Sequence, residues 1–324
     1  MKLRDIKNIA NAIFKASSAQ ILTEIEASKE IFKKEGKPRL TSYANMLLRG
    51  WSPSFCAEMV QHQKWLASEG HEGKRLRWYI GDPTNLNNLD LRGADFRNTP
   101  IYKANFSDSD LSGADFSNAA IVHSNFEGAK LQSAIFKDAS VNNCYIYRVN
   151  LFNANLTNAN LSHSTISCTN MNSVQAEGIK IRKSSIRLLR SAGGNFKNSD
   201  FDGSNITFPY ISEANFSGSN LQNTTFNGGL VELCDLSYTK LMNTSMNAAK
   251  FEYCNFYGSN LKKAQFLQSN FKGSDFTNVE NIGTTNFKGS IMDNVGGLNR
   301  RQRRAAHFDG KVVSAKKPKG PQPK

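Results

Sequence analysis

The sequence predicts a mainly β fold: a four-sided solenoid of about ten coils, preceded by a small α-helical region and followed by a basic disordered tail. Two observations carry this prediction. Large apolar residues recur at every fifth position from Leu86 to Phe276, except at Ala176 and Ser191, and a small residue lies two places before most of them. An α-helix repeats every 3.6 residues and a strand every 2, so neither has this period.

The stretch "ANFSDSDLSGADFSNAA" (104–120) shows the geometry behind the repeat. In extended chain, a large residue and the residue two places before it face the same side. Because five is an odd number, the chain must bend once per repeat to turn each large residue inward. Gly, Asn, Asp and Ser follow the large residues at these bends, as turns require. A chain that bends regularly and keeps one side inward is a solenoid.

The number of sides follows from where Phe occurs. Phe takes 11 of the 20 large positions whose numbers end in 6, but 3 of the 19 whose numbers end in 1. Alternate sides therefore differ, which requires an even number of sides per coil. Four sides of five residues make the smallest closed coil. Residues twenty apart then stack in columns, such as Phe96, Phe116 and Phe136, at the ~4.8 Å spacing of paired strands.

The repeats "ANFSD", "SDLSG", "ADFSN", "ANLTN" and "ANLSH" resemble the pentapeptide-repeat family, whose members form right-handed quadrilateral β-helices. This resemblance implies such a β-helix over residues 86–294. The pattern is broken in residues 173–194, where Val174, Ile179 and Leu189 replace small residues. We expect an irregular coil there, from which a binding loop protrudes. Phe287 follows Phe276 by eleven residues, so the register is expected to slip by one where the rod ends.

The two ends of the chain lack the five-residue period. Residues 1–85 are expected to form a helical cap, because apolar residues recur at helical spacing from Leu3 to Phe32. A second helix is expected from Ser52–Pro53 to a terminating Gly70. The following stretch "WLASEGHEGKR" is similar to a lead-in segment found before many bacterial pentapeptide repeats. Residues 295–324 are expected to be a largely disordered basic tail.

Composition excludes several classes of function. The five cysteines form no CxxC pair, and no catalytic or metal-ligating cluster is apparent. His123 and His163 should point outward, two coils apart, while Cys234 and Cys254 should stack inside the rod. We therefore expect no enzyme, no cofactor and no metal. Without a signal peptide or membrane span, the chain is expected to be cytoplasmic at synthesis, with export as an effector as an alternative.

Positive charge gathers in two places that are candidate binding sites. The net charge is +14, of which residues 295–324 supply +8 and residues 86–294 only +1. The first site, the basic belt, occupies outward positions around one coil. It comprises Lys180, Arg182, Lys183, Arg187 and Arg190. The second site, the arginine cluster, comprises Arg300, Arg301, Arg303 and Arg304.

These features leave three functional hypotheses. The first is a non-enzymatic scaffold that binds a protein partner, as a bacterial effector or a regulatory binding protein. The second, by analogy with some pentapeptide-repeat proteins, is a DNA mimic that binds a topoisomerase such as gyrase. The near-neutral rod is a weak mimic of DNA, which carries one charge per ~1.7 Å. The third is attachment to nucleic acid or an anionic membrane surface through the basic segments. The chain is expected to be a monomer or an end-to-end homodimer.

Overall fold

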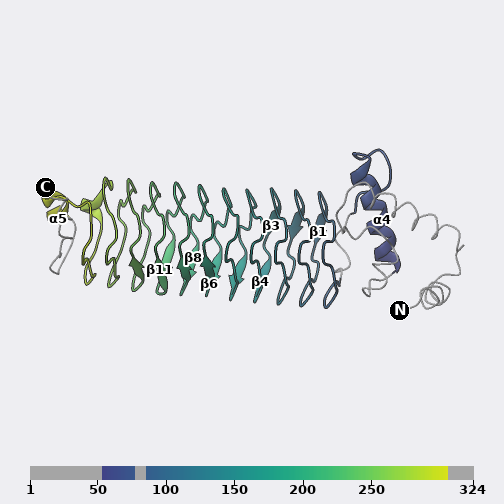
Figure 1. The fold of residues 1–324 in the computed structure, drawn as a ribbon, viewed down its shortest axis with the longest axis horizontal. Coiled ribbons are helices and arrows are strands. Elements are labelled where there is room, and N and C mark those ends of the chain that lie inside the picture. The colour runs from purple at the N-terminus through teal and green to yellow at the C-terminus, as the bar shows by residue number, and fades with distance from the viewer. Residues whose placement is uncertain (1–52, 77–84, 306–324) are drawn as a thin grey trace, which may run out of the picture.

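The computed structural model describes residues 53–76 and 85–305, which form a long solenoid with a helix at each end (Figure 1). Helix α4 spans Pro53–Ala67, the 3₁₀ helix η1 spans Ile282–Thr284 and helix α5 spans Arg300–Ala305. Twelve strands of three residues lie between α4 and η1. They are β1 (Pro100–Tyr102), β2 (Ala120–Val122), β3 (Ser140–Asn142), β4 (Tyr145–Tyr147), β5 (Thr165–Ser167), β6 (Ser185–Arg187), β7 (Arg190–Ala192), β8 (Asn205–Thr207), β9 (Tyr210–Ser212), β10 (Thr225–Asn227), β11 (Leu230–Glu232) and β12 (Lys250–Glu252).

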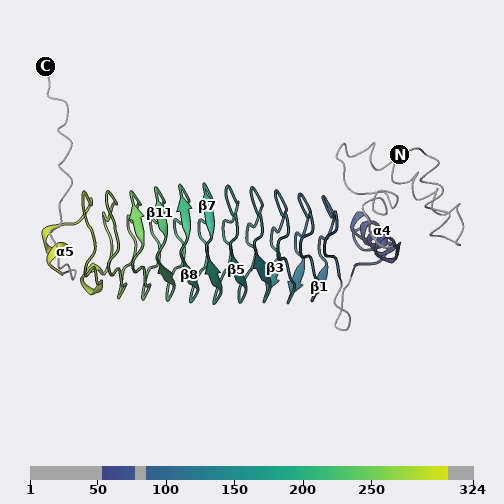
Figure 2. The ribbon, with the colours of Figure 1, turned by 90° about the horizontal axis from the view of Figure 1, so that it is seen from below.

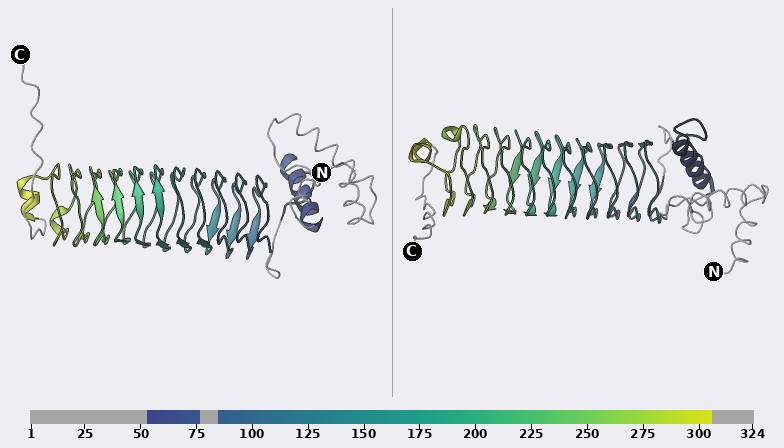
Figure 3. Two further views of the ribbon diagram at one scale, coloured as in Figure 1. Left: turned by 60° about the horizontal axis from the view of Figure 1, so that its bottom comes forward. Right: turned by 45° about the horizontal axis from the view of Figure 1, so that its top comes forward.

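The strands pair in parallel across a spacing of twenty residues, as Ile101 with Ile121 and Val231 with Phe251. This spacing confirms a coil of four five-residue sides. Three sheets lie on different sides of the rod: β1-β2-β3, β10-β8-β6-β5-β4 and β12-β11-β9-β7. In Figure 2, β7 and β11 lie along one side, whereas β5 and β8 lie along another. Single bridges continue the same register between the sheets, so the coils stack in succession along the rod (Figure 3).

Columns of large side chains fill the interior. The rings of Phe96 and Phe116 stack with centroids 4.8 Å apart, and those of Phe116 and Phe136 stack at 4.7 Å. Phe106, on another side of the coil, meets Phe116 edge to face at 6.0 Å. Both contact geometries are favourable for aromatic rings. The predicted column at twenty-residue spacing is confirmed.

The small residues two places before the large ones complete the core. Ser219 is fully buried, and its hydroxyl donates to the Phe196 carbonyl at 2.8 Å while accepting the Ser199 N–H at 3.1 Å. Ser274 makes the same pair of bonds later in the rod, donating to the Phe251 carbonyl at 2.7 Å and accepting the Cys254 N–H at 3.0 Å. A buried hydroxyl is tolerated only when it is hydrogen-bonded in this way. The position therefore accepts Ala, Ser, Thr and Cys, but a larger residue needs a compensating change nearby.

The bends use the residues that the sequence predicts. Asn98, Asp108 and Asn118 have φ angles of 57°, 55° and 56°. Asn and Asp reach this left-handed region more readily than most residues. The Asp115 carboxylate accepts the Ser117 N–H at 2.9 Å, which adds a side-chain turn before the bend. Asn or Asp immediately before a large residue therefore has a structural role at each turn.

The expected irregular coil at residues 173–194 is wrong. The bridges from Gln175 to Asn195 and from Lys180 to Asp200 keep the twenty-residue register, so no loop protrudes. Val174, Ile179 and Leu189 are all buried. They fit because the neighbouring large positions hold the small residues Ala176 and Ser191. Val174 has exchanged places with Ala176, and Leu189 with Ser191, whereas Ile179 precedes the large residue Ile181. The two exchanges offset the added volume inside the coil.

The predicted register slip is confirmed. Gln265 bridges Asn286 and Asn270 bridges Ile291, a spacing of twenty-one residues instead of twenty. The 3₁₀ helix η1 lies within this coil and accommodates the additional residue. Phe287 is fully buried despite the slip, and the last bridge joins Asp275 to Gly296. The solenoid therefore continues beyond the insertion.

Helix α4 packs on the first coil. Phe55, Cys56 and Met59 are buried in the same core as the solenoid residues. The His62 side chain is fully buried, and its Nδ1 accepts the Leu76 N–H at 3.1 Å. Its Nε2 lies 3.1 Å from the Thr99 hydroxyl. A ring nitrogen that accepts an N–H is unprotonated, so His62 is neutral in this arrangement. The helical segment expected from Leu3 to Phe32 lies outside the described residues.

Acid is expected to loosen this contact. Burial lowers the pKa of His62; Asp95 and a backbone hydrogen bond at Arg97 oppose this effect, and the charges of Arg75 and Arg97 reinforce it. The docked state therefore favours the neutral ring. Its stability is fully present above the ordinary histidine pKa of about 6.5 and falls as the pH drops below that value. The protection factor of the Leu76 amide, which corrects for the slower intrinsic exchange in acid, should be smaller at about pH 5 than at about pH 7.5.

The His62→Gln variant is the control, because Gln can hydrogen-bond but does not titrate in this range. Its Leu76 exchange, corrected for intrinsic rates, should not respond to acid. Equal protection of Leu76 at both pH values in the unsubstituted chain would show that His62 does not govern docking.

Candidate interaction surface

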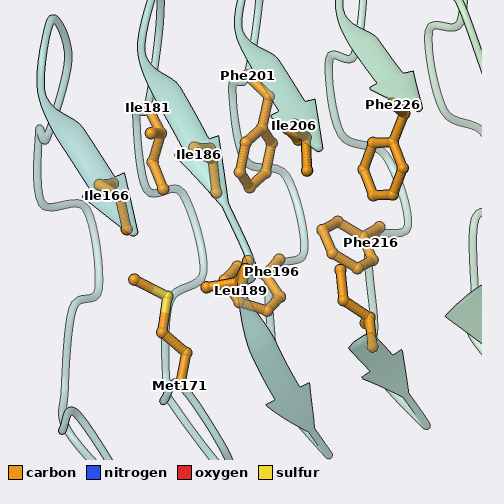
Figure 4. A pocket seen from close by; sticks show the side chains of 11 residues that line it. Ile166, Met171, Ile181, Ile186, Leu189, Phe196, Phe201, Ile206, Phe216 and Phe226 are labelled. Carbon is orange, nitrogen blue, oxygen red and sulfur yellow. The ribbon is translucent and has the colours of Figure 1, made fainter. Parts of the chain in front are cut away.

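The interior of the solenoid offers no room for a ligand. The void in Figure 4 has a volume of about 10 Å³ and only apolar side chains line it, including Ile181, Phe196 and Phe216. A second void beside Phe126 and Phe136 measures about 20 Å³. Voids of this size hold at most about one water molecule, and water needs polar partners. Binding by the described part of the rod therefore takes place on its outer surface.

The basic belt spans three successive sides of one coil. Lys180 lies on the first side, Arg187 ends β6 on the next and Arg190 begins β7 on the third. Arg182 and Lys183 lie at the bend between the first two sides. All five side chains are exposed, as the sequence predicts. A flat partner on one side of the rod cannot contact the whole belt at once.

The belt is divided by its ion pairs. Arg182 Nε donates to Asp200 Oδ2 at 2.6 Å, and this carboxylate raises the pKa of Arg182. Asp202 adds a second negative charge nearby. Among the described residues, no ion pair joins Arg187 or Arg190 to a carboxylate. Lys180 and Lys183 likewise have no ion pair among the described residues, so the positive charge that a partner can use lies at these two lysines and at Arg187 and Arg190.

The arginine cluster falls on helix α5, so the region expected to be a disordered tail begins with an ordered turn of helix. Gln302 N–H donates to the Asn299 side chain at 2.8 Å, and Asn299 N–H donates back to the Gln302 side chain at 3.0 Å. This reciprocal pair caps the helix. Arg303 is bound to the Leu298 carbonyl at 3.0 Å. Arg300, Arg301 and Arg304 are exposed. Residues 306–324 lie outside the described ranges.

Cys234 and Cys254 contact each other in the core, as predicted, but the other reactive side chains of the described residues do not converge. His123 and His163 are exposed and lie two coils apart, while Cys234 and Cys254 are free and buried in the core. Burial raises the pKa of the Cys144 thiol to about 12, which keeps it protonated. Within 53–76 and 85–305, no group of three or more His, Cys, Asp or Glu could hold a metal ion. In the same ranges, no helix is long and apolar enough to cross a membrane.

A group of exposed apolar side chains was missed by sequence reasoning. Phe208, Tyr210, Leu233 and Tyr253 are 52–56% exposed, and Leu230 is partly exposed. We call these five residues the aromatic strip. They occupy outward positions where the repeat usually places Asn, Asp, Ser, Gly or Lys. Large residues outside the five-residue register are the signal that identifies them.

Comparison with solved structures finds other solenoids of this type. HetL of the cyanobacterium Nostoc sp. strain PCC 7120, involved in heterocyst differentiation regulation, is 15% identical, with 62% of this chain and 88% of HetL covered and a TM-score of 0.40. A trypsin-treated QnrB1 variant, a plasmid-mediated fluoroquinolone resistance protein, is 21% identical. It covers 64% of this chain and 87% of its own, with a TM-score of 0.25.

A third solved structure is a pentapeptide repeat protein from the thylakoid lumen of Arabidopsis thaliana. It is 22% identical, with 36% of this chain and 68% of its own covered and a TM-score of 0.23. No curated protein matches the chain. The pentapeptide-repeat family model matches residues 84–113, 109–146, 144–182, 199–237 and 239–278, which together make up more than half of the sequence. The chain therefore belongs to the pentapeptide-repeat family.

Proposed function

We propose that this chain is a non-enzymatic scaffold that binds other proteins through the sides of its rod. The filled interior carries this proposal, because the two voids between its apolar side chains, of about 10 and 20 Å³, are too small to hold a substrate. Each side is a regular array of outward side chains on short parallel strands and bridges. Such an array holds its side chains in fixed positions, which lowers the entropy lost on binding.

The basic belt contributes through Arg187 and Arg190. Arginine binds carboxylates and phosphates in a two-pronged geometry, so these two side chains suit an acidic partner. The DNA-mimic alternative needs a continuous negative surface. The first coils do carry aspartates, but Asp90 pairs with Arg92 at 2.6 Å and Asp95 with Arg97 at 2.7 Å. This charge pattern favours the scaffold.

The test compares three classes of partner in parallel. Full-length chain is immobilised and exposed to nuclease-treated, membrane-cleared lysate of the source organism, to a random-sequence DNA duplex and to phosphatidylserine vesicles. Each binding is repeated at low and high salt. We expect specific proteins to be retained at both salt concentrations and identified by mass spectrometry. DNA and vesicles should be released by salt, since contacts to phosphate are strongly salt-dependent.

Two variants locate the contribution of the belt. Arg187→Gln combined with Arg190→Gln should weaken retention of an acidic partner, whereas Arg182→Gln, the matched control, should have little effect because Asp200 already neutralises that side chain. DNA or vesicle binding that the double variant abolishes, with no protein retained at either salt concentration, would contradict the scaffold. In that case each lost phosphate contact should lower the salt slope by about one unit.

A further inference from the structure

The sheet β12-β11-β9-β7 has an unusual outward row. Its register places Arg190, Tyr210, Leu230 and Lys250 directly one above the other. Two uncharged residues with large apolar groups thus lie between two cations. A strand that faces water usually presents small polar residues on that side. The stability of the rod does not require Tyr210 and Leu230 to be exposed next to each other, since other outward positions hold small polar residues.

The other members of the aromatic strip extend this row to both neighbouring bends. Phe208 precedes Tyr210 at one bend, while Leu233 and Tyr253 lie on successive coils at the opposite bend. The strip therefore crosses the sheet diagonally and rises by two coils, about 10 Å. It contains four of the eight exposed large apolar side chains in the described ranges. Such gathering, and not a single exposed residue, indicates an interaction site.

Two of the rings are held in place by glycines on the following coil. A Cβ atom at Gly228 would lie 2.9 Å from the Phe208 ring, and one at Gly273 would lie 2.4 Å from the Tyr253 ring. These rings therefore lie against bare backbone, in space that only glycine leaves open. Side chains fixed before binding lose less entropy when a partner arrives. The strip is a preformed surface.

Charge is arranged unevenly around the strip. Arg187 and Arg190 lie on the coil that precedes Phe208 and Tyr210, at one end of the strip. Glu213, Glu232 and Glu252 lie along the bend that holds Leu233 and Tyr253, and Glu252 also accepts a bond from Asn270 at 2.6 Å. Two arginines at one end of the strip, the single Lys250 at the other end of the row and carboxylates along one edge define an orientation for a bound chain. The carboxylates also disfavour nucleic acid and anionic lipid here.

We propose that the aromatic strip docks a segment of a partner protein, which lays apolar side chains across Tyr210 and Leu230. This segment carries a carboxylate that meets Arg187 and Arg190, and a lysine or arginine that meets the glutamates beside Leu233. The inference rests on the proposed scaffold function and names its surface. Aromatic residues surrounded by polar groups are typical centres of binding energy in protein interfaces.

The test selects ligands without assuming their sequence. A displayed library of random peptides is enriched on immobilised full-length chain, and the enriched peptides are synthesised. We expect them to contain apolar residues flanked by an acidic residue on one side and a basic residue on the other. Combining Tyr210→Ser with Leu230→Ser should weaken their binding by about tenfold or more. Arg190→Gln should weaken peptide binding less than the double variant does. The loss caused by Arg190→Gln should be larger at low salt than at high salt.

Phe152→Ser is the matched control. Phe152 is 47% exposed and lies near the same bend of the coil as Leu233, but several coils before the aromatic strip. It should leave binding unchanged, and circular dichroism should show an intact fold for every variant. Enriched peptides that bind equally to the Tyr210→Ser/Leu230→Ser chain would overturn the strip but retain the scaffold at another surface. Failure to enrich any peptide overturns the strip, and retention of lysate proteins then decides the scaffold separately. If sedimentation shows that the chain dimerises across the strip and that the dimer no longer binds peptide, this surface serves self-association instead.

Discussion

Phe116→Asp is expected to unfold the coils around position 116, and Phe116→Ala to destabilise the solenoid by about 3–5 kcal/mol. Phe116 is fully buried between Phe96 and Phe136, with ring centroids 4.8 and 4.7 Å away. Alanine leaves a cavity that the stacked coils cannot close, because strand pairing fixes their spacing. Aspartate additionally places an unpaired charge in a column without polar groups. Denaturant unfolding followed by circular dichroism measures both effects.

Ser117→Ala is the control for this prediction. Ser117 lies next in sequence but faces outward, where its hydroxyl bonds to Asp115 at 2.6 Å. Removing a partly exposed hydrogen bond of this kind should cost about 1 kcal/mol or less. Similar destabilisation by Phe116→Ala and Ser117→Ala would mean that the assignment of inward and outward positions is incorrect.

Deletion of residues 1–80 is expected to make the chain aggregate or associate end to end. The deletion removes Phe55, Met59 and Leu76, which are buried against the first coil, together with the hydrogen bond between His62 and Thr99. The first coil would then expose apolar side chains and an open strand edge, which pairs readily with another chain. Size-exclusion chromatography with light scattering measures the resulting mass.

A shorter deletion that ends before Pro53 retains helix α4 and should remain closer to the behaviour of the full chain. Comparing the two deletions separates the contribution of α4 from that of the residues before it. A soluble, monomeric chain after removal of residues 1–80 would show that the first coil needs no cap. The helical region would then be an independent module.

The repeating part of the fold was predictable because it depends on a pattern and not on particular contacts. Inward and outward positions follow from the odd period, and the stacking of Phe96 on Phe116 follows from a twenty-residue coil. The slip before Phe287 could also be read from spacing alone. Residues 173–194 misled the same reasoning. The pattern tests each position separately. It therefore does not detect that Val174 and Ala176 have exchanged large and small side chains, although only their summed volume must fit inside the coil.

The individual features of this rod do not follow from the repeat. They depend on the length of particular side chains and on contacts at the ends of the rod. The column rule places Asp200 above Lys180, yet Arg182 reaches it from the bend because its side chain is long. The contact between His62 and Thr99 joins a helix to the rod, and no periodicity relates the two elements. The aromatic strip was present in the sequence as large residues at outward positions, but the core pattern drew attention away from them.

The twenty-residue coil also determines how this surface can change by insertion and deletion. Removing a whole coil would shorten the rod by one step of about 4.8 Å and leave every later side chain facing its original direction. Removing one five-residue unit would instead rotate all later residues by a quarter turn about the rod axis. The Phe-rich columns, whose numbers end in 6, would then stack on the Phe-poor columns, whose numbers end in 1. Removing ten residues would turn it by half while keeping each class aligned. Insertion or deletion of whole coils thus changes the distance between two binding surfaces along the rod, whereas insertion or deletion of five-residue units changes the directions in which the two surfaces face.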